Sequence, residues 1–225
     1  MFHKCNTEER EIIPFNQTAY QTGKGCNLHV MTIRLLKALA RKMKQKLFVI
    51  FTDFEAAFDL VSRRILFEKL VKLGVSAVML NALMAIYLAS QSVVEYKGEF
   101  SDYVMLLCGI KQGAPPSGIL YIAYTLDIIG IYDNEFHPEP LIFILHLLMH
   151  ADDILLLATT RALAIQKLKC LMKYSKPNYI KLQLKKCALL CINSNDEEDN
   201  MPITIDDVIL ECKKEEVYLG SVITN

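Results

Sequence analysis

Apolar residues in the first quarter of the chain follow a helical period and then form an unbroken run. The helical period is carried by Leu28, Met31, Leu35, Leu36 and Leu39. It predicts an amphipathic helix, with Asn27 able to cap its start and the basic residues 41–44 at its end. The run at 47–51 is rich in β-branched and aromatic residues, so it predicts a central strand that is buried on both faces. Asp53 lies just beyond this strand.

The same patterns place elements along the rest of the chain. Helices are expected at 62–73, 77–89, 117–129 and 162–174, and strands at 93–96, 103–107, 141–149, 154–158, 179–184, 188–192 and 217–224. The strands 93–96 and 103–107 are expected to pair as a β-hairpin. Ser62 and Ser117 can cap the helices that they begin. Two glycines and two prolines interrupt residues 109–116 and predict a loop. The sequence contains no internal repeat and no linker, so one compact unit is expected.

Composition narrows the class of protein without giving a function. Of the 225 residues, 52% are hydrophobic, which indicates a globular chain with a substantial core. Lys and Arg total 25 against 25 Asp and Glu, so the net charge provides no attraction to nucleic acid. The seven cysteines form no CxxC pair and no zinc spacing, and we interpret them as reduced core residues. The N-terminus is too charged for a signal peptide and the apolar runs are too short to span a bilayer. An intracellular protein without a membrane partner is expected, in either nucleus or cytoplasm.

Three aspartates follow or interrupt buried strands, where carboxylates have no packing role. Asp152 and Asp153 separate the apolar runs 141–149 and 154–158. Considered alone, this pair is typical of an exposed turn. Asp53, at the end of a second buried strand, changes the interpretation, because adjacent strands of one sheet would bring the three acids together. Such a cluster needs cations to offset repulsion and desolvation, and it suits Mg²⁺ and phosphoryl transfer.

Ordered motifs resemble those of a known family. They are FTDFEAAFD at 51–59, GIKQGAPPSG at 109–118, HADDILLLA at 150–158, YIKLQLKKC at 179–187 and YLG at 218–220, preceded by NQTAYQTGKGC at 16–26. The series resembles the palm motifs of reverse transcriptases, and its type is similar to that of non-LTR (LINE-like) retrotransposons. The resemblance implies an α+β polymerase palm whose antiparallel sheet carries the acidic cluster. Helices would pack on one face, with partial fingers and no full thumb.

The resemblance also implies domain limits and a metal site. Residues 1–26 would be a polar N-terminal segment left from the fingers, and residues 27–225 a palm with partial fingers. Asp53 and Asp152 would be the principal metal ligands, with Asp153 beside them as a third catalytic acid. These acids would bind two Mg²⁺ ions, for which Mn²⁺ can substitute.

Further residues take roles from the same resemblance. Phe54 would offer its carbonyl to a metal, and Phe58 would exclude a 2′-hydroxyl, unless it is a core residue at the start of a helix. Gln112 and Gly113 would brace the nucleotide and template, although the residues alone indicate only a turn. Lys186 matches a general acid toward pyrophosphate, with a solvated lysine as the alternative. A primer grip would comprise Tyr218, Leu219 and Gly220, which alone indicate an ordinary terminal strand.

The implied activity is RNA-directed DNA polymerisation, with an RNA template, a DNA primer and dNTPs as partners and the oligomeric state left open. Several positions depart from the usual pattern, among them Gly118, where proline is common, and His150, where an aromatic residue is usual. No departure removes a metal ligand. The alternatives are a catalytically inactive retrotransposon remnant that at most binds nucleic acid or a partner, and an α+β protein with unrelated surface acids.

Overall fold

The computed structural model describes residues 13–142, 145–205 and 208–225. Predictions for residues 1–12 and for part of the strand at 141–149 therefore lie outside the described residues. The helices are α1 (Cys26–Met43), α2 (Arg63–Lys72), α3 (Ala77–Leu88), α4 (Ser117–Thr125), α5 (Asp127–Glu135), α6 (Arg161–Ser175) and a 3-10 turn, η1 (Glu198–Asn200). The strands are β1 (Leu47–Thr52), β2 (Gln91–Ser92), β3 (Glu95–Tyr96), β4 (Glu99–Phe100), β5 (Val104–Met105), β6 (Leu147–His150), β7 (Asp153–Ala158), β8 (Ala188–Ile192), β9 (Ile203–Ile205), β10 (Val208–Lys213), β11 (Glu215–Tyr218) and β12 (Ser221–Thr224).

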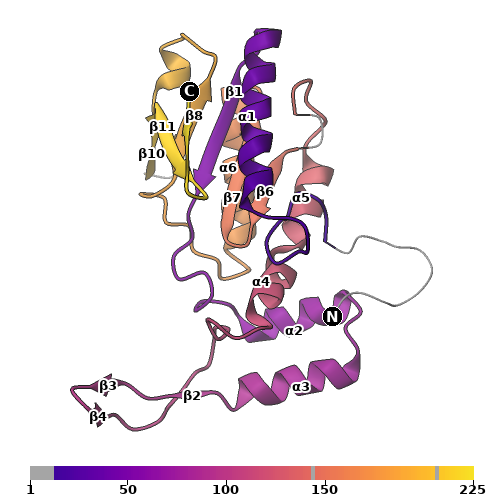
Figure 1. The fold of residues 1–225 in the computed structure, drawn as a ribbon, viewed down its shortest axis with the longest axis vertical. Helices are drawn as coiled ribbons and strands as arrows, with labels where there is room; N and C mark the ends of the chain where they lie inside the picture. Colours follow the sequence, from indigo (N-terminus) through magenta and orange to yellow (C-terminus); the bar gives the residue numbers. More distant parts are fainter. Residues whose placement is uncertain (1–12, 143–144, 206–207) are drawn as a thin grey trace.

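A sheet with the order β6-β7-β1-β8-β10-β9 forms the centre of the molecule (Figure 1). Strand β1 pairs antiparallel with β7 on one side and with β8 on the other. Strand β10 joins β8 in parallel, and all other pairs of this sheet are antiparallel. Every residue of β1 is buried, as the unbroken apolar run predicts. The predicted α+β class with an antiparallel-rich sheet is confirmed.

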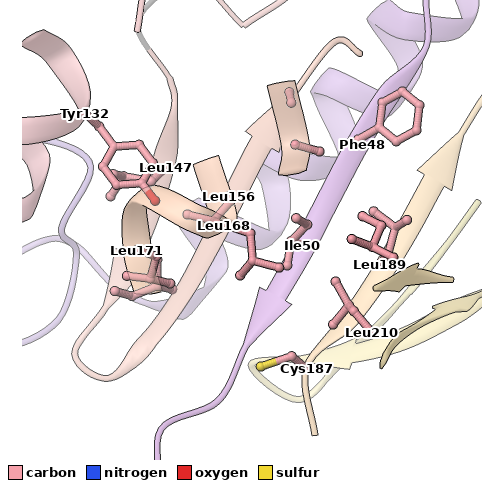
Figure 2. Packing of buried hydrophobic residues seen from close by; sticks show 14 of the residues in the cluster. Phe48, Ile50, Tyr132, Leu147, Leu156, Leu168, Leu171, Cys187, Leu189 and Leu210 are labelled. Atoms are coloured by element: carbon pink, nitrogen blue, oxygen red, sulfur yellow. The ribbon is translucent and has the colours of Figure 1, made fainter. Parts of the chain in front are cut away.

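Successive residues of β1 point to opposite faces of the sheet and build two cores. Phe48 and Ile50 pack with residues of α5 and α6, including Tyr132 and Leu168 (Figure 2). Leu47, Val49 and Phe51 face α1 and the β11–β12 hairpin in the second core. Helices α5 and α6 therefore share one face and α1 covers the other, so helices pack on both faces of the sheet and not on one as expected (Figure 1).

A third core joins α2, α3 and α4 beside the sheet (Figure 1). Its polar centre is Arg63, only 6% exposed, which donates hydrogen bonds to the carbonyls of Tyr87, Leu106 and Gly109. One guanidinium thus ties α2 to the end of α3 and to the two ends of the segment 106–109. This contact fixes the start of the loop that leads into α4.

Strands β2 to β5 form an arm, residues 91–107, that extends away from the body (Figure 1). The predicted pairing of 93–96 with 103–107 is wrong. Lys97 and Gly98 have positive φ angles of 52° and 85° and make a two-residue turn, which pairs β3 only with β4. Strand β5 pairs instead with β2, and all four strands are exposed.

A buried ion pair stabilises the sheet at the end farthest from the aspartates. Lys167, on α6, has no solvent exposure and donates to Glu139 and to the carbonyl of Leu157. The other oxygen of Glu139 accepts from the backbone N–H and the hydroxyl of Thr159, at 2.6 and 2.7 Å. Both charges are thereby satisfied inside the protein.

Several predicted boundaries need correction. Helix 117–129 divides after Thr125, whose hydroxyl donates 3.1 Å to the carbonyl of Tyr121 and so competes with the helical ladder. Gly25, not Asn27, is at the N-cap of α1, and Ser117 is the first residue of α4 and not its cap. Residues 179–184 contain only one bridge, because Tyr179 has φ of 52° and turns the chain. Residues 217–224 contribute to two strands, since Leu219 and Gly220 form a turn.

The described residues bear on the expected state of the cysteines and on the expectation about membrane spans. The cysteines among them, at positions 26, 108, 170, 187, 191 and 212, are free thiols. Within the described ranges no helix is both long and apolar enough to cross a membrane.

Candidate metal centre at the end of the central strands

The three aspartates lie at one end of the central sheet. Thr52 of β1 pairs with Ile154 of β7, so the next positions along the two strands are Asp53 and Asp153. His150 pairs with Asp153 and closes a two-residue turn that contains Asp152. The strand registers thus bring together the acids that the sequence identified, at the tip of one hairpin and the end of its neighbour.

The cluster gathers negative charge with one lysine beside it. Burial, followed by the charges of Asp152 and Asp53, raises the pKa of Asp153 to about 6. The Oδ2 atom of Asp53 is buried and has no hydrogen-bond partner among the described residues. Lys186 forms an ion pair with this oxygen, with its Nζ 3.7 Å away and beyond hydrogen-bonding distance. An unpartnered carboxylate oxygen beside two further acids is a suitable place for a cation.

The donors fit Mg²⁺ in kind but do not form a complete protein cage. In the part of the chain that the structure describes, no three His, Cys, Asp or Glu side chains are arranged to hold one metal ion. Mg²⁺ typically takes one or two carboxylates and completes its shell with water and substrate phosphates. Asp53 and the Asp152–Asp153 pair can supply such a partial set of oxygen ligands.

The backbone after β1 is held by the segment before β8. Asp53 accepts a hydrogen bond from the N–H of Gln183 at 2.8 Å, and Glu55 donates to the carbonyl of Lys181 at 2.8 Å. Phe54, between them, is 8% exposed and bridges Leu182. Both bonds are made by the neighbours of Phe54, so neither occupies its own carbonyl. This arrangement fixes Asp53 although the strand has ended.

The turn that carries Asp152 is held by a segment that the sequence analysis assigned no chemical role. Thr18 donates to the carbonyl of Met149 at 3.0 Å, and Met149 donates to the carbonyl of Asn16 at 2.7 Å. The side-chain oxygen of Gln17 accepts from the N–H of Ala151 at 3.2 Å. A run of polar residues at 16–18 has no hydrophobic period. Its burial could have been suspected only from its place in the motif 16–26.

His150 has partners on both ring nitrogens. Its Nδ1 lies 2.9 Å from the hydroxyl of Thr18 and its Nε2 lies 3.3 Å from the sulfur of Cys26. A phenylalanine or tyrosine ring at this position could not make both contacts. The departure from the usual aromatic residue is therefore accommodated by Thr18, in the segment before α1, and by Cys26, the first residue of α1.

Phe58 lies in a series of turns between β1 and α2 and not at a helix start, and it packs partly buried against the third core. Its ring stacks on that of Tyr121 at a centroid distance of 4.8 Å and an angle of 20°. The hydroxyl of Tyr121 is buried without a hydrogen-bond partner among the described atoms. Burial, with a smaller contribution from Asp152, raises the pKa of Tyr121. The stacked pair therefore joins the turns after β1 to helix α4.

The loop 109–116 is anchored at its start and open at its middle. Gly109 has φ of 80°, and a Cβ there would lie 2.8 Å from the carbonyl oxygen of Asp59, so only glycine fits. Gln112 donates to the carboxylate of Asp59 at 3.3 Å, and Gly113 has φ of 79°. Both residues are exposed, so the loop is accessible at the positions that the sequence singled out.

Gly118 supports a close contact that proline could not make. A Cβ at this position would lie 2.4 to 2.5 Å from the ring of Tyr20. The absence of a side chain in the first turn of α4 thus leaves room for the N-terminal segment that contains Tyr20.

The three primer-grip candidates divide into a buried residue and a turn. Tyr218 is 4% exposed, its ring contacts Phe51 edge to face, and its hydroxyl lies 3.2 Å from Nδ1 of His29. Leu219 and Gly220 form the turn between β11 and β12. Burial, with a smaller contribution from Asp153, raises the pKa of Tyr218, which locates this hairpin close to the acids.

Comparisons with known proteins agree with this geometry. A family model described as reverse transcriptase (RNA-dependent DNA polymerase) matches residues 3–223. A telomerase from Candida albicans, solved in complex with a TWJ fragment of telomeric RNA, is similar with a TM-score of 0.65 and 13% identity over 93% of this chain and 34% of that chain. An apo telomerase from Candida tropicalis, truncated from the C-terminal domain, matches with a TM-score of 0.60 and 14% identity over 93% of this chain and 41% of that chain. The chain thus spans between about a third and two fifths of these solved chains, and at such identities the likeness shows the fold alone.

Proposed function

Because this chain belongs to the reverse transcriptase (RNA-dependent DNA polymerase) family, which matches it over residues 3–223, we propose that it extends a DNA primer with dNTPs on an RNA template. The proposal includes the non-LTR (LINE-like) type, on the basis of the ordered motifs. It rests most on one observation, the meeting of Asp53, Asp152 and Asp153 at one end of the sheet with an unpartnered carboxylate oxygen. Carboxylates gathered in this way can bind the cations that nucleotidyl transfer needs. Without cations, their desolvation lowers the stability of the fold.

In this proposal Asp53 and Asp152 are the principal ligands of two Mg²⁺ ions, with Asp153 as a third catalytic acid and the carbonyl of Phe54 available to one ion. The ions held by these residues would lower the pKa of the primer hydroxyl and offset charge on the leaving pyrophosphate. Lys186, whose Nζ is 3.7 Å from Asp53, is close enough to the same space to give a proton to pyrophosphate. Burial, and then repulsion from Asp152 and Asp53, raise the pKa of Asp153, and a cation bound beside it would offset both effects.

The incoming nucleotide would bind between the acids and the loop 109–116. Phe58, held by its stack on Tyr121, presents a rigid ring that can exclude a 2′-hydroxyl. Gln112 and Gly113 are accessible for contacts to the nucleotide and template. At the primer side, Leu219 and Gly220 form the contacting turn, and the buried Tyr218 supports it from below.

We also propose the domain assignment that the motifs imply. Residues 27–225 would form a palm with partial fingers, and residues 1–26 would be a polar segment left from the fingers. The solved telomerase with bound telomeric RNA supports an RNA partner only by analogy of fold.

Primer extension on an RNA template, with purified protein and Mg²⁺ or Mn²⁺, tests the proposal. Asp152→Asn should reduce the extension rate by a factor on the order of 10³ or more, since a metal site contributes several kcal/mol to the transition state. Asp102→Asn, on the exposed arm, is the matched control and should extend at the wild-type rate. Extension that survives Asp152→Asn would show that the acids do not carry the reaction.

A second candidate is the inactive remnant, which one observation favours. The described residues do not supply three protein ligands to a single ion. Such a protein would show no extension with either metal, no metal-linked increase in melting temperature, and nucleic-acid binding that is insensitive to Mg²⁺. An increase in melting temperature with Mn²⁺ that is lost in Asp152→Asn would exclude it.

A further inference from the structure

The turn that presents Asp152 contains a strained residue. Ala151, its first position, has φ of 56°, a region that suits glycine and costs other residues about 1–2 kcal/mol. The residue is 7% exposed and packs with Ala19 and Ile122, so its Cβ has a fixed place. Strain of this kind persists only where surrounding contacts impose it.

One side chain imposes this conformation. The Oε1 atom of Gln17 accepts hydrogen bonds from the N–H of Ala151 at 3.2 Å and from the N–H of Ala19 at 2.9 Å. Gln17 has no solvent exposure, and its backbone bridges Met149 of β6 in parallel. The carboxamide oxygen therefore sits at a fixed point relative to β6 and aims the turn that follows.

The nitrogen of the Gln17 side-chain amide does not contribute to stability. Its Nε2 atom is buried without a hydrogen-bond partner among the described residues, which costs free energy. An apolar side chain of the same length would avoid that cost and fill the same volume. The glutamine is therefore best explained by what its oxygen does for the turn.

We propose that Gln17 is a positioning residue, which holds Asp152 in the orientation that binds metal by fixing the backbone of Ala151. The inference rests on the proposed polymerase function, because it assigns Gln17 a purpose only if Asp152 is a ligand. Gln17 itself contacts no substrate. It acts through the turn, as outer partners act on metal ligands in other proteins.

Three variants separate positioning from general stability. Gln17→Met keeps the length of the side chain and removes the acceptor. Ala151→Gly lets the turn adopt its conformation without help, so Gln17→Met/Ala151→Gly should recover what the single change loses. Gln45→Met is the matched control, because Gln45 lies just before the start of β1, whereas the aspartates lie at the other end of that strand. The backbone carbonyl of Gln45, not its side chain, accepts the hydrogen bond from Asn193.

Mn²⁺ affinity, measured by calorimetric titration, is the main readout, together with kcat and KM for dNTP and the free energy of unfolding without metal. Gln17→Met should weaken Mn²⁺ binding and lower kcat by roughly 10- to 100-fold with little change in KM. In the double variant, Mn²⁺ affinity and kcat should return to within a few-fold of the wild-type values. Gln45→Met should not differ from the wild type in either quantity.

Each remaining outcome is decisive. A folded Gln17→Met variant with wild-type Mn²⁺ affinity and kcat overturns the positioning role alone. A loss that Ala151→Gly does not recover, accompanied by an equal loss of stability, assigns Gln17 to folding and also overturns it. A wild-type protein that neither binds Mn²⁺ nor extends a primer overturns the proposed function, and this inference with it.

Discussion

Two stretches of similar composition have opposite surroundings in this molecule. Residues 47–51 and 103–107 are both runs of five residues without a charge, yet the first is buried throughout and the second is exposed throughout. The difference lies in the partners. Strand β1 gains β7 and β8 from distant parts of the chain, whereas β5 pairs only with the two residues of β2. An apolar run becomes a scaffold for a site only where other segments cover both its edges and its faces.

Truncation of the same side chain in β1 and in the exposed arm should give the largest contrast in the free energy of unfolding. Phe48→Ala removes a ring with no solvent exposure and should lower the free energy of unfolding by about 4 kcal/mol, because it leaves a cavity in the sheet core. Phe100→Ala, where the ring is 67% exposed, should change it by about 0.5 kcal/mol or less. Urea unfolding of both variants measures the difference, and similar midpoints would contradict the comparison.

A buried and an exposed ion pair should differ nearly as much in what they contribute to the free energy of unfolding. Glu139→Gln leaves Lys167 buried beside a neutral partner and should cost roughly 3–4 kcal/mol. Glu68→Gln breaks the exposed pair with Arg64 on α2 and should cost about 0.5 kcal/mol or less. Thermal and urea unfolding report both values. A loss of under about 1 kcal/mol for Glu139→Gln would mean that the buried charges contribute little.

Acid should destabilise the sheet region through His29. Burial, and then the charge of His150, lowers the pKa of His29 to about 4. The unfolded state takes up this proton near pH 6.5 and the folded state only near pH 4. The stabilising contribution is therefore complete above pH 6.5 and decreases as the pH falls toward 4, by up to about 3 kcal/mol.

Asp153, whose pKa is raised to about 6, contributes in the opposite direction over the same range, so the test is the difference between two proteins: urea unfolding between pH 7 and pH 4 should show stability falling more steeply with acid in the wild type than in His29→Gln. The exposed His137→Gln is the control, and its slope should equal that of the wild type. Equal slopes for all three proteins would remove His29 as the cause.

Changes to the arm should have the smallest effect on folding. Tyr96→Ser, Phe100→Ser and Tyr103→Ser each replace a ring that is 67% to 77% exposed, so each should alter the free energy of unfolding by about 0.5 kcal/mol or less. Together they should raise solubility, because they divide an exposed apolar surface. Unfolding curves and the saturation concentration of the triple variant test this, and a loss of several kcal/mol would show that the arm folds onto the body.

Local patterns predict those parts of the fold that depend on nearby residues. The period of α1 and the burial of β1 are visible in the sequence because packing repeats at fixed spacing. The bend at Thr125 depends on one hydroxyl, and the pairing of β5 with β2 depends on the turn at Lys97, so neither changes the hydrophobic pattern. The convergence of the acids was predictable from strand ends, but the contact of Gln17 with Ala151 spans 134 residues and leaves no local signal.

The central position of β1 also determines when the protein can fold during its synthesis. Cys187, which contacts Asp53 just before β8 begins, is made 134 residues after it. At roughly 5–20 residues per second, β1 therefore waits on the order of ten seconds without its second neighbour. During that time both edges of this largely apolar strand are open until β7 is made, and one edge stays open until β8 follows. Cells that make this protein would need to shield that edge, and slower translation before β8 would lower the yield of folded protein.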